Sequence, residues 1–452
     1  MIHKFKQGDL YFVLDVNSGA VHVIDEIVFD ALEFYPQNNA ISVIRSLKDK
    51  YPEQAIKETL EEIDFLIEND MLFTNDAYVN SIEFNNRMPI IKALCLHVAH
   101  DCNIRCAYCF ASQGDFKGDR SLMSFEVGKK ALDLLIANSG NRRNLEVDFF
   151  GGEPLMNFDV VKQLVTYGRS IEAEHNKNFR FTMTTNGVLL NDEIIDYLNA
   201  NMSNVVLSID GRKAVNDKMR YTISGGGTYD IIVEKFKKLI DKREGKSYYV
   251  RGTFTKNNLD FANDVIHLAD LGFKSTSVEP VVAKPTDSYA ITEMDIETLS
   301  EQYELLANEI VKRNNTDQAF SFFHFAIDMK QGPCVIKRLS GCGAGSEYLA
   351  VTPEGDIYPC HQFVGNDHFK MGNVLAGVLD FALTSEFKNA HVYNKEKCRS
   401  CWAKFYCSGG CHANAYNFNN DIFVPYEIGC ALERKRIESS IYIYGKLNHS
   451  EV

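Results

Sequence analysis

Three cysteines stand close together early in the chain: Cys102, Cys106 and Cys109, separated by three and then two residues. Thiolates are soft ligands that suit zinc or an iron-sulfur cluster. A four-iron cluster normally takes four cysteines, so a loop that offers three would leave one iron open to a small ligand. Such an open iron predicts a catalytic site, and a zinc loop is the alternative.

A second group of cysteines lies in the last third of the chain, at Cys342, Cys360, Cys398, Cys401, Cys407, Cys411 and Cys430. The first residues show no export signal, so we expect a cytoplasmic protein. A reducing compartment keeps thiols open, and the 12 cysteines therefore favour metal chemistry over disulfides. The alternative to iron-sulfur clusters is a zinc knuckle, which would use Cys398, Cys401, Cys407 and Cys411.

Composition and charge narrow the possible partners. The chain has 452 residues, of which 45% are hydrophobic and 24% charged, as in a folded globular protein. Its 48 basic and 61 acidic side chains give a net charge of -13, which disfavours nucleic acid as a partner. No apolar run approaches the roughly 18 residues that a membrane span needs. We therefore expect neither nucleic acid nor membrane to be a partner.

Residues 91–325 alternate apolar strands with amphipathic helices, which predicts parallel βα units. The expected strands are 93–99, 145–152, 179–187, 204–211, 248–255 and 274–282. The expected helices are 124–138, 158–175, 192–199, 229–243 and 261–271. Six units form a partial (β/α)6 barrel that stays open on one side. In such α/β barrels, chemistry sits at the carboxyl ends of the strands.

Two further units flank the barrel. The pattern of residues 1–75 predicts strands at 10–15 and 20–24, followed by helices near 25–35, 40–50 and 53–69. This order is typical of a winged-helix-like domain. This unit holds six basic and fourteen acidic residues, so its charge is -8. Residues 76–90 look like a linker. Residues 326–452 lack regular periodicity, as expected if inorganic clusters replace an apolar core.

Polar residues follow several of the predicted strands. Gly151, Gly152 and Glu153 end the second strand, where glycines let the backbone approach a ligand and a carboxylate can accept from an ammonium group. Taken alone, this stretch is more typical of a plain turn. Ser208 ends the fourth strand, and Arg220 downstream could pair with a carboxylate or lie on the surface.

The cysteine spacing, with the aromatic Tyr108 before the third thiol, is similar to the motif of the radical S-adenosylmethionine (SAM) superfamily. The resemblance implies that Cys102, Cys106 and Cys109 hold a [4Fe-4S] cluster. SAM would chelate the open iron, and one electron would cleave it to a 5′-deoxyadenosyl radical. The resemblance also implies a set of SAM contacts: Tyr108, Gly151, Gly152, Glu153, Ser208 and Arg220.

The later cysteines resemble the SPASM extension of radical SAM peptide-modifying enzymes, which carries two auxiliary [4Fe-4S] clusters. The resemblance implies an outer set of ligands, Cys398, Cys401, Cys407 and Cys430. It also implies an inner set, Cys342, Cys360 and Cys411. The fourth ligand of the inner set stays open: Cys334 could supply it, or a substrate thiol could bind there.

The whole architecture resembles the thioether-forming (sactipeptide) maturases of ribosomally made peptides, in particular those acting on the six-cysteine SCIFF peptides of clostridia. The resemblance implies a cysteine-rich precursor whose leader adds a strand at Ala20 to Ile24. It also implies a reductant such as flavodoxin or ferredoxin. No catalytic acid or base is assigned, and Glu279 on the sixth strand is only a candidate. The alternatives are sulfatase-type Ser or Cys oxidation, a peptide carbon-carbon crosslink, or a non-catalytic zinc-binding protein.

Overall fold

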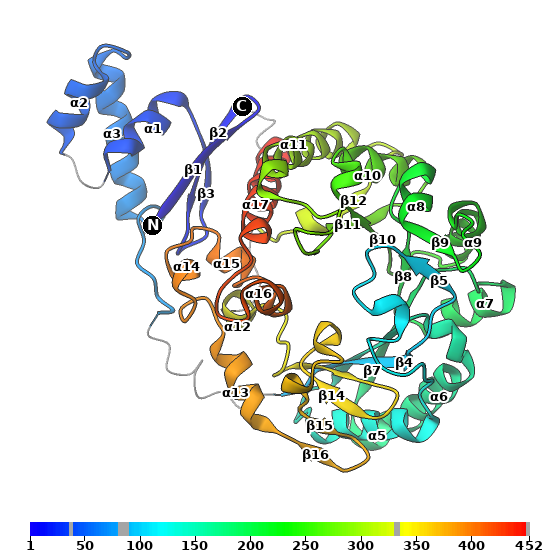
Figure 1. The fold of residues 1–452 in the computed structure, drawn as a ribbon. Helices are drawn as coiled ribbons and strands as arrows, with labels where there is room; N and C mark the ends of the chain where they lie inside the picture. Colours follow the sequence, from blue (N-terminus) through cyan, green and yellow to red (C-terminus); the bar gives the residue numbers. More distant parts are fainter. Residues whose placement is uncertain (36–38, 80–89, 330–334, 449–452) are drawn as a thin grey trace.

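The centre of the protein is an eleven-stranded sheet, whose strands follow the order β12-β11-β10-β8-β7-β6-β4-β13-β14-β15-β16 (Figure 1). The computed structural model describes residues 1–35, 39–79, 90–329 and 335–448. The six predicted strands are confirmed and run parallel to their neighbours. They are β4 (Ala93–Ala99), β6 (Asn144–Gly151), β7 (Asn178–Thr185), β8 (Asn204–Ser208), β10 (Tyr248–Phe254) and β11 (Ser275–Pro280).

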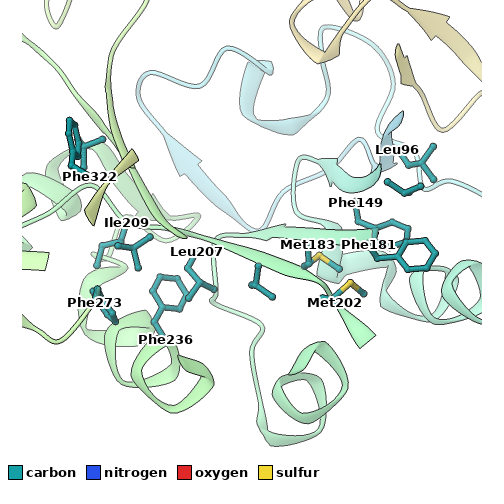
Figure 2. Close-up of a cluster of buried hydrophobic side chains, with 14 of the residues drawn as sticks. Leu96, Phe149, Phe181, Met183, Met202, Leu207, Ile209, Phe236, Phe273 and Phe322 are labelled. Atoms are coloured by element: carbon teal, nitrogen blue, oxygen red, sulfur yellow. The ribbon is translucent and has the colours of Figure 1, made fainter. Parts of the chain in front are cut away.

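Helices cover the outer face of this curved sheet. They are α5 (Phe125–Ala137), α6 (Phe158–His175), α7 (Asp192–Asn201), α9 (Tyr229–Asp241), α10 (Phe261–Asp270) and α11 (Ile296–Arg313). The Ser124 side chain accepts from the Val127 backbone N–H and so fixes the start of α5. Figure 2 shows the core between sheet and helices, where Leu207 of β8 lies near Phe236 of α9. Burial of these side chains holds the strand ends in place.

The six-stranded sheet is extended at both edges instead of closing into a ring. Strand β12 (Ser321–Phe322) pairs in parallel with β11, and β13 (Tyr348–Val351) pairs in parallel with β4. The cysteine-rich region then adds three antiparallel strands beyond β13: β14 (Asp356–Tyr358), β15 (Gly372–Asn373) and β16 (Val378–Leu379). This region is thus continuous with the barrel sheet.

The amino-terminal unit contains one strand more than we predicted. Strands β1 (Ile2–Gln7), β2 (Leu10–Asp15) and β3 (Val21–Ile24) form an antiparallel sheet. The three predicted helices are present as α1 (Glu26–Ala31), α2 (Ala40–Leu47) and α3 (Glu53–Glu68). One face of the sheet packs on these helices through Val13, and the other packs on the last helix through Phe12.

The carboxyl-terminal region has apolar cores of its own, so the expectation that clusters replace them is wrong. One core gathers Phe363, Phe369 and Phe387. Its helices are α12 (Val335–Ser340), α13 (Phe381–Asn389), α14 (Glu396–Arg399), α15 (Lys404–Cys407), α16 (His412–Asn419) and α17 (Glu427–Asn448). Within the described ranges, no helix combines the length and apolar character that crossing a bilayer requires.

Helix α17 and the loop before α15 support the amino-terminal sheet (Figure 1). His3 of β1 stacks on Trp402 with ring centroids 3.6 Å apart, and its Nε2 lies 3.0 Å from Glu438 of α17. Asp76 binds the buried Lys404 ammonium at 2.9 Å and accepts from the Tyr393 hydroxyl at 2.7 Å. The first 76 residues therefore rest directly on the segment that carries Cys401 and Cys407.

Candidate active site

A cavity of about 380 Å³ opens at the carboxyl ends of the barrel strands. The structure brings every residue that we predicted for the SAM site to its wall. These residues are Cys102, Cys106, Tyr108, Cys109, Gly151, Gly152, Glu153, Ser208 and Arg220. Residues far apart in sequence meet because the ends of parallel strands converge on one rim.

A short two-stranded ribbon fixes Arg220 beside the cysteine loop. Strand β5 (Ile104–Cys106) pairs antiparallel with β9 (Arg220–Thr222), so that Cys106 lies opposite Arg220. Helix α8 (Lys213–Met219) leads directly into β9. The strand propensity of three residues is too weak to reveal this pairing in the sequence. Arg220 is buried at the cavity wall, so the surface alternative for this residue is wrong.

Tyr108, Asp210 and Arg220 form a buried hydrogen-bonded group. The Tyr108 hydroxyl donates to the Asp210 carboxylate, at 2.7 and 2.8 Å from its two oxygens, and accepts from Arg220 Nη1 at 3.1 Å. Burial raises the pKa of Asp210 to about 6, although Arg220 and Tyr108 oppose this shift. Arg220 Nε has no hydrogen-bond partner within the described residues. The guanidinium therefore has one buried donor that no described residue satisfies.

Glu153 is fully buried between the ends of β6 and β7. Its Oε1 accepts from the Thr185 hydroxyl at 2.7 Å and from the Leu155 N–H at 3.1 Å. Its Oε2 accepts from the Asn186 N–H at 2.8 Å and has room for one further donor. Burial raises the pKa of Glu153 to about 7, and these hydrogen bonds oppose it.

The two glycines before Glu153 are required by the protein backbone itself. Gly151 has φ of +126°, and a Cβ there would stand 2.3 Å from the Ala99 carbonyl oxygen. A Cβ on Gly152 would stand 2.1 Å from the Asp101 carbonyl oxygen. These glycines therefore bring β6 against the cysteine loop, an explanation that differs from the ligand approach we expected.

Asn186 follows the third barrel strand, whose end we expect at the same rim, and it lines the cavity. Its side-chain nitrogen lies 3.7 Å from the Cys102 sulfur and 2.8 Å from the Asn103 side-chain oxygen. The side chain thus joins the end of β7 to the cysteine loop. Hydrogen bonds to ligand sulfurs are one way in which proteins adjust an iron-sulfur cluster.

The three thiols of the loop fit a cluster better than one zinc ion. Burial raises the pKa of Cys102 to about 11 and that of Cys106 to about 12, so these thiols need a bound cation to lose their protons. In the part of the chain that the structure describes, no three His, Cys, Asp or Glu side chains gather closely enough to hold a single metal ion. All three cysteines instead line the cavity of about 380 Å³ at the barrel rim.

The four cysteines of the predicted outer set, Cys398, Cys401, Cys407 and Cys430, line one small cavity together. Cys411 is not in that lining, but it shares a second cavity with Cys407 and Cys430, so the two predicted sets adjoin at Cys411. The division into an outer and an inner set stays a prediction. In the predicted inner set, burial is the largest cause that raises the pKa of Cys360, and the nearby thiols of Cys411 and Cys342 raise it further. Cys334 lies outside the described residues.

Comparison with known proteins identifies the two main parts of the chain. The family model of the radical SAM superfamily matches residues 96–259, and that of the SPASM iron-sulfur cluster-binding domain matches residues 342–402. The chain therefore contains a radical SAM domain and a SPASM domain. The radical SAM domain binds a [4Fe-4S] cluster and SAM, and the SPASM domain binds auxiliary iron-sulfur clusters.

Relatives of this radical SAM protein differ in how much of it they match. The cysteine-type anaerobic sulfatase-maturating enzyme of Clostridium novyi is 24% identical and covers 74% of this chain and 91% of its own. The structure of native anSMEcpe with bound AdoMet has a TM-score of 0.65 at 20% sequence identity, and it covers 79% of this chain and 100% of its own. The structure of Streptococcus suis SuiB bound to precursor peptide SuiA has a TM-score of 0.54 at 17% sequence identity. It covers 95% of this chain and 98% of its own.

Two further features bear on how a substrate enters this radical SAM protein. Cys411 of the inner set and Glu279 of β11 both line the SAM cavity. Glu279 is paired with Arg251 at 2.7 Å, so it is not a free base. In the amino-terminal unit, β3 pairs only with β2, which leaves its other edge without a strand partner among the described residues.

Proposed function

We propose that this protein is a maturase that forms thioether crosslinks, from a Cys sulfur to an acceptor carbon, in a cysteine-rich peptide that carries a leader. The observation that supports this most directly is the shared cavity. Cys411 of the proposed inner set lines the same cavity as Cys102, Cys106 and Cys109. A substrate thiol bound at the inner set would therefore lie beside the carbon from which a hydrogen atom is removed.

We assign Cys102, Cys106 and Cys109 as ligands of the SAM-binding cluster. When bound and reduced, this cluster supplies the electron that cleaves SAM to a 5′-deoxyadenosyl radical, which abstracts a hydrogen atom. The free position on Glu153 Oε2 accepts from the SAM amino group, and the guanidinium of Arg220 on the cavity wall donates to its carboxylate. Ser208 is within the same wall and contacts the ribose or carboxylate.

The inner and outer sets have different parts in this proposal. The inner set offers three thiols, and with Cys334 as a bystander the fourth position is open for a substrate cysteine. A coordinated thiol loses its proton readily, which prepares the sulfur for bonding. The outer set has four cysteines, and a fully ligated cluster there carries an electron away. Flavodoxin or ferredoxin is the proposed reductant of the protein.

The amino-terminal sheet is the proposed docking site for the leader. The free edge of β3 can accept a strand from an extended peptide. Docking would raise the effective concentration of the core peptide at the cavity. SuiB, whose structure contains a precursor peptide, matches 95% of this chain, whereas anSMEcpe matches 79%. That difference in coverage favours a leader-bearing peptide over a sulfatase-type substrate.

Co-expression with candidate cysteine-rich precursors tests the reaction. We expect the peptide to lose two hydrogens for each crosslink, and the crosslinked cysteines to resist alkylation by iodoacetamide. The matched control is the variant in which Cys102, Cys106 and Cys109 are all alanine, which should leave the peptide unchanged. A product oxidised at Ser or Cys without a crosslink would instead establish the sulfatase-type reaction, and a crosslink with alkylatable thiols would establish a carbon-carbon bond.

A further inference from the structure

Lys395 lies among the carboxyl-terminal cysteines and is completely buried. Its ammonium group donates to the carbonyl oxygen of Gly409 at 2.8 Å. An ammonium group has three donors, so one neutral acceptor leaves it poorly satisfied. A buried charge is retained in a protein only where opposite charge compensates it.

The groups that compensate Lys395 are cysteines. Burial lowers its pKa, and the thiols of Cys398, Cys407, Cys411 and Cys430 act in the opposite direction. Three of these four belong to the outer set and one to the inner set. Gly409, whose carbonyl oxygen accepts from Lys395, lines the cavity that Cys398, Cys401, Cys407 and Cys430 share. These sulfurs and what they bind are therefore placed to supply the negative charge that Lys395 requires.

Two nearby lysines show that this arrangement is specific to Lys395. Lys404, also buried, is paired with the Asp76 carboxylate at 2.9 Å. Lys397, which precedes Cys398, is exposed and is paired with Glu427. Both of these lysines line the cavity of the outer set, but each is paired with a carboxylate.

We propose that Lys395 raises the reduction potential of the auxiliary cluster held by the outer set. Reduction adds one negative charge to a cluster, and a positive charge buried beside it stabilises that reduced form. Lys395 is a tuning residue here and contacts no substrate. The inference rests on the ligand set proposed above.

A higher potential at the outer set suits the proposed reaction. Thioether formation removes one hydrogen atom from the acceptor carbon and one proton from the thiol. One electron is then left over when the carbon-sulfur bond forms, and it must leave the substrate. Lys395 favours its arrival at the outer set, since it stabilises the added charge.

Redox titration of the anaerobic holoenzyme, followed by electron paramagnetic resonance, tests the proposal. The variants are Lys395→Met and Lys395→Gln, with Lys395→Arg as the matched control that keeps the charge. We expect Met and Gln at position 395 to raise the oxidised-to-reduced ratio of the outer cluster at least tenfold at a fixed potential, which is 59 mV for one electron. Lys395→Arg should leave the ratio unchanged. The SAM-binding cluster, recognised by its response to added SAM, is the internal reference.

The iron content of each variant separates the possible failures. Full iron with an unshifted ratio in both neutral variants would overturn the role of Lys395 and leave the proposed ligand set intact. That set is tested independently by Cys398→Ala, which should lower the iron content. If Lys395→Met does not load iron, the comparison of Lys395→Gln with Lys395→Arg tests whether the charge at position 395 shifts the reduction potential. Loss of iron in all three would make Lys395 a packing residue and also overturn the proposal.

Discussion

The free edge of β3 allows leader docking to be tested with one backbone donor. Asp15 N–H donates to the Ala20 carbonyl at 2.8 Å, so these two residues form a hydrogen-bonded pair. Hydrogen-bonded and non-hydrogen-bonded pairs alternate along antiparallel strands. Val21 and Val23 therefore direct their N–H groups away from β2, toward the side where a leader strand would add.

Replacing Val21 by proline removes one of these outward donors. The side chain is part-buried and the residue faces Leu14 in a non-hydrogen-bonded pair, so no bond within the sheet is lost. One net hydrogen bond is worth about 1 kcal/mol, which corresponds to about fivefold in Kd. Fluorescence anisotropy of a labelled leader peptide on the full chain measures the change.

The matched control is Val21→Ala, which shortens the side chain and keeps the N–H. We expect the alanine variant to bind the leader nearly as well as the unmodified protein, and both variants to cleave SAM at the same rate without peptide. Equal Kd values for the proline and alanine variants would refute strand addition at β3. A leader bound elsewhere would give that result.

Other regions of the structure make further predictions. Changing Cys102, Cys106 and Cys109 together to alanine should abolish SAM cleavage and remove about a third of the iron, since three four-iron clusters are expected. Chromatography of 5′-deoxyadenosine measures SAM cleavage, and cleavage that persists in this variant would contradict the assignment. Asp76→Ala should destabilise the protein by about 3 kcal/mol, because it leaves the Lys404 ammonium buried without its partner; an unchanged denaturant midpoint would argue against this. Burial raises the pKa of Asp76, but the hydrogen bonds to it outweigh burial and hold it below its usual range. The stabilisation by Asp76 is therefore present above the unfolded pKa of about 3.9 and lost as pH falls further. Unfolding between pH 5 and 3 should show a larger loss of stability in the unmodified protein than in Asp76→Ala.

The barrel and its rim could be predicted because their signals are local. Strands such as Ala93–Ala99 are continuous apolar runs, which is typical of parallel strands buried on both faces. Once these strands are placed, the rule that their ends share one rim brings Glu153 and Ser208 beside the cysteine loop. The spacing of the cysteines then supplied the chemistry.

Other features depend on contacts between distant residues and could not be predicted. Strand β1 has the sequence IHKFKQ, whose charged residues conceal its alternation. The Arg220 position depends on pairing with Cys106, and the Asp76 position on a lysine 328 residues away. Helix α17 packs on both the barrel and the amino-terminal sheet, so its apolar residues do not form one stripe.

The support of the amino-terminal unit explains why a deletion is a poor test of leader docking. We expect removal of residues 1–75 to impair peptide modification while SAM cleavage continues. The same deletion would also expose the face of α17 around Gly445 and take away the His3 ring that covers Trp402. Trp402 follows Cys401 directly, so damage to the outer set would mimic the loss of docking. Val21→Pro changes only the edge of β3, and it therefore separates recognition of the leader from support of the outer set.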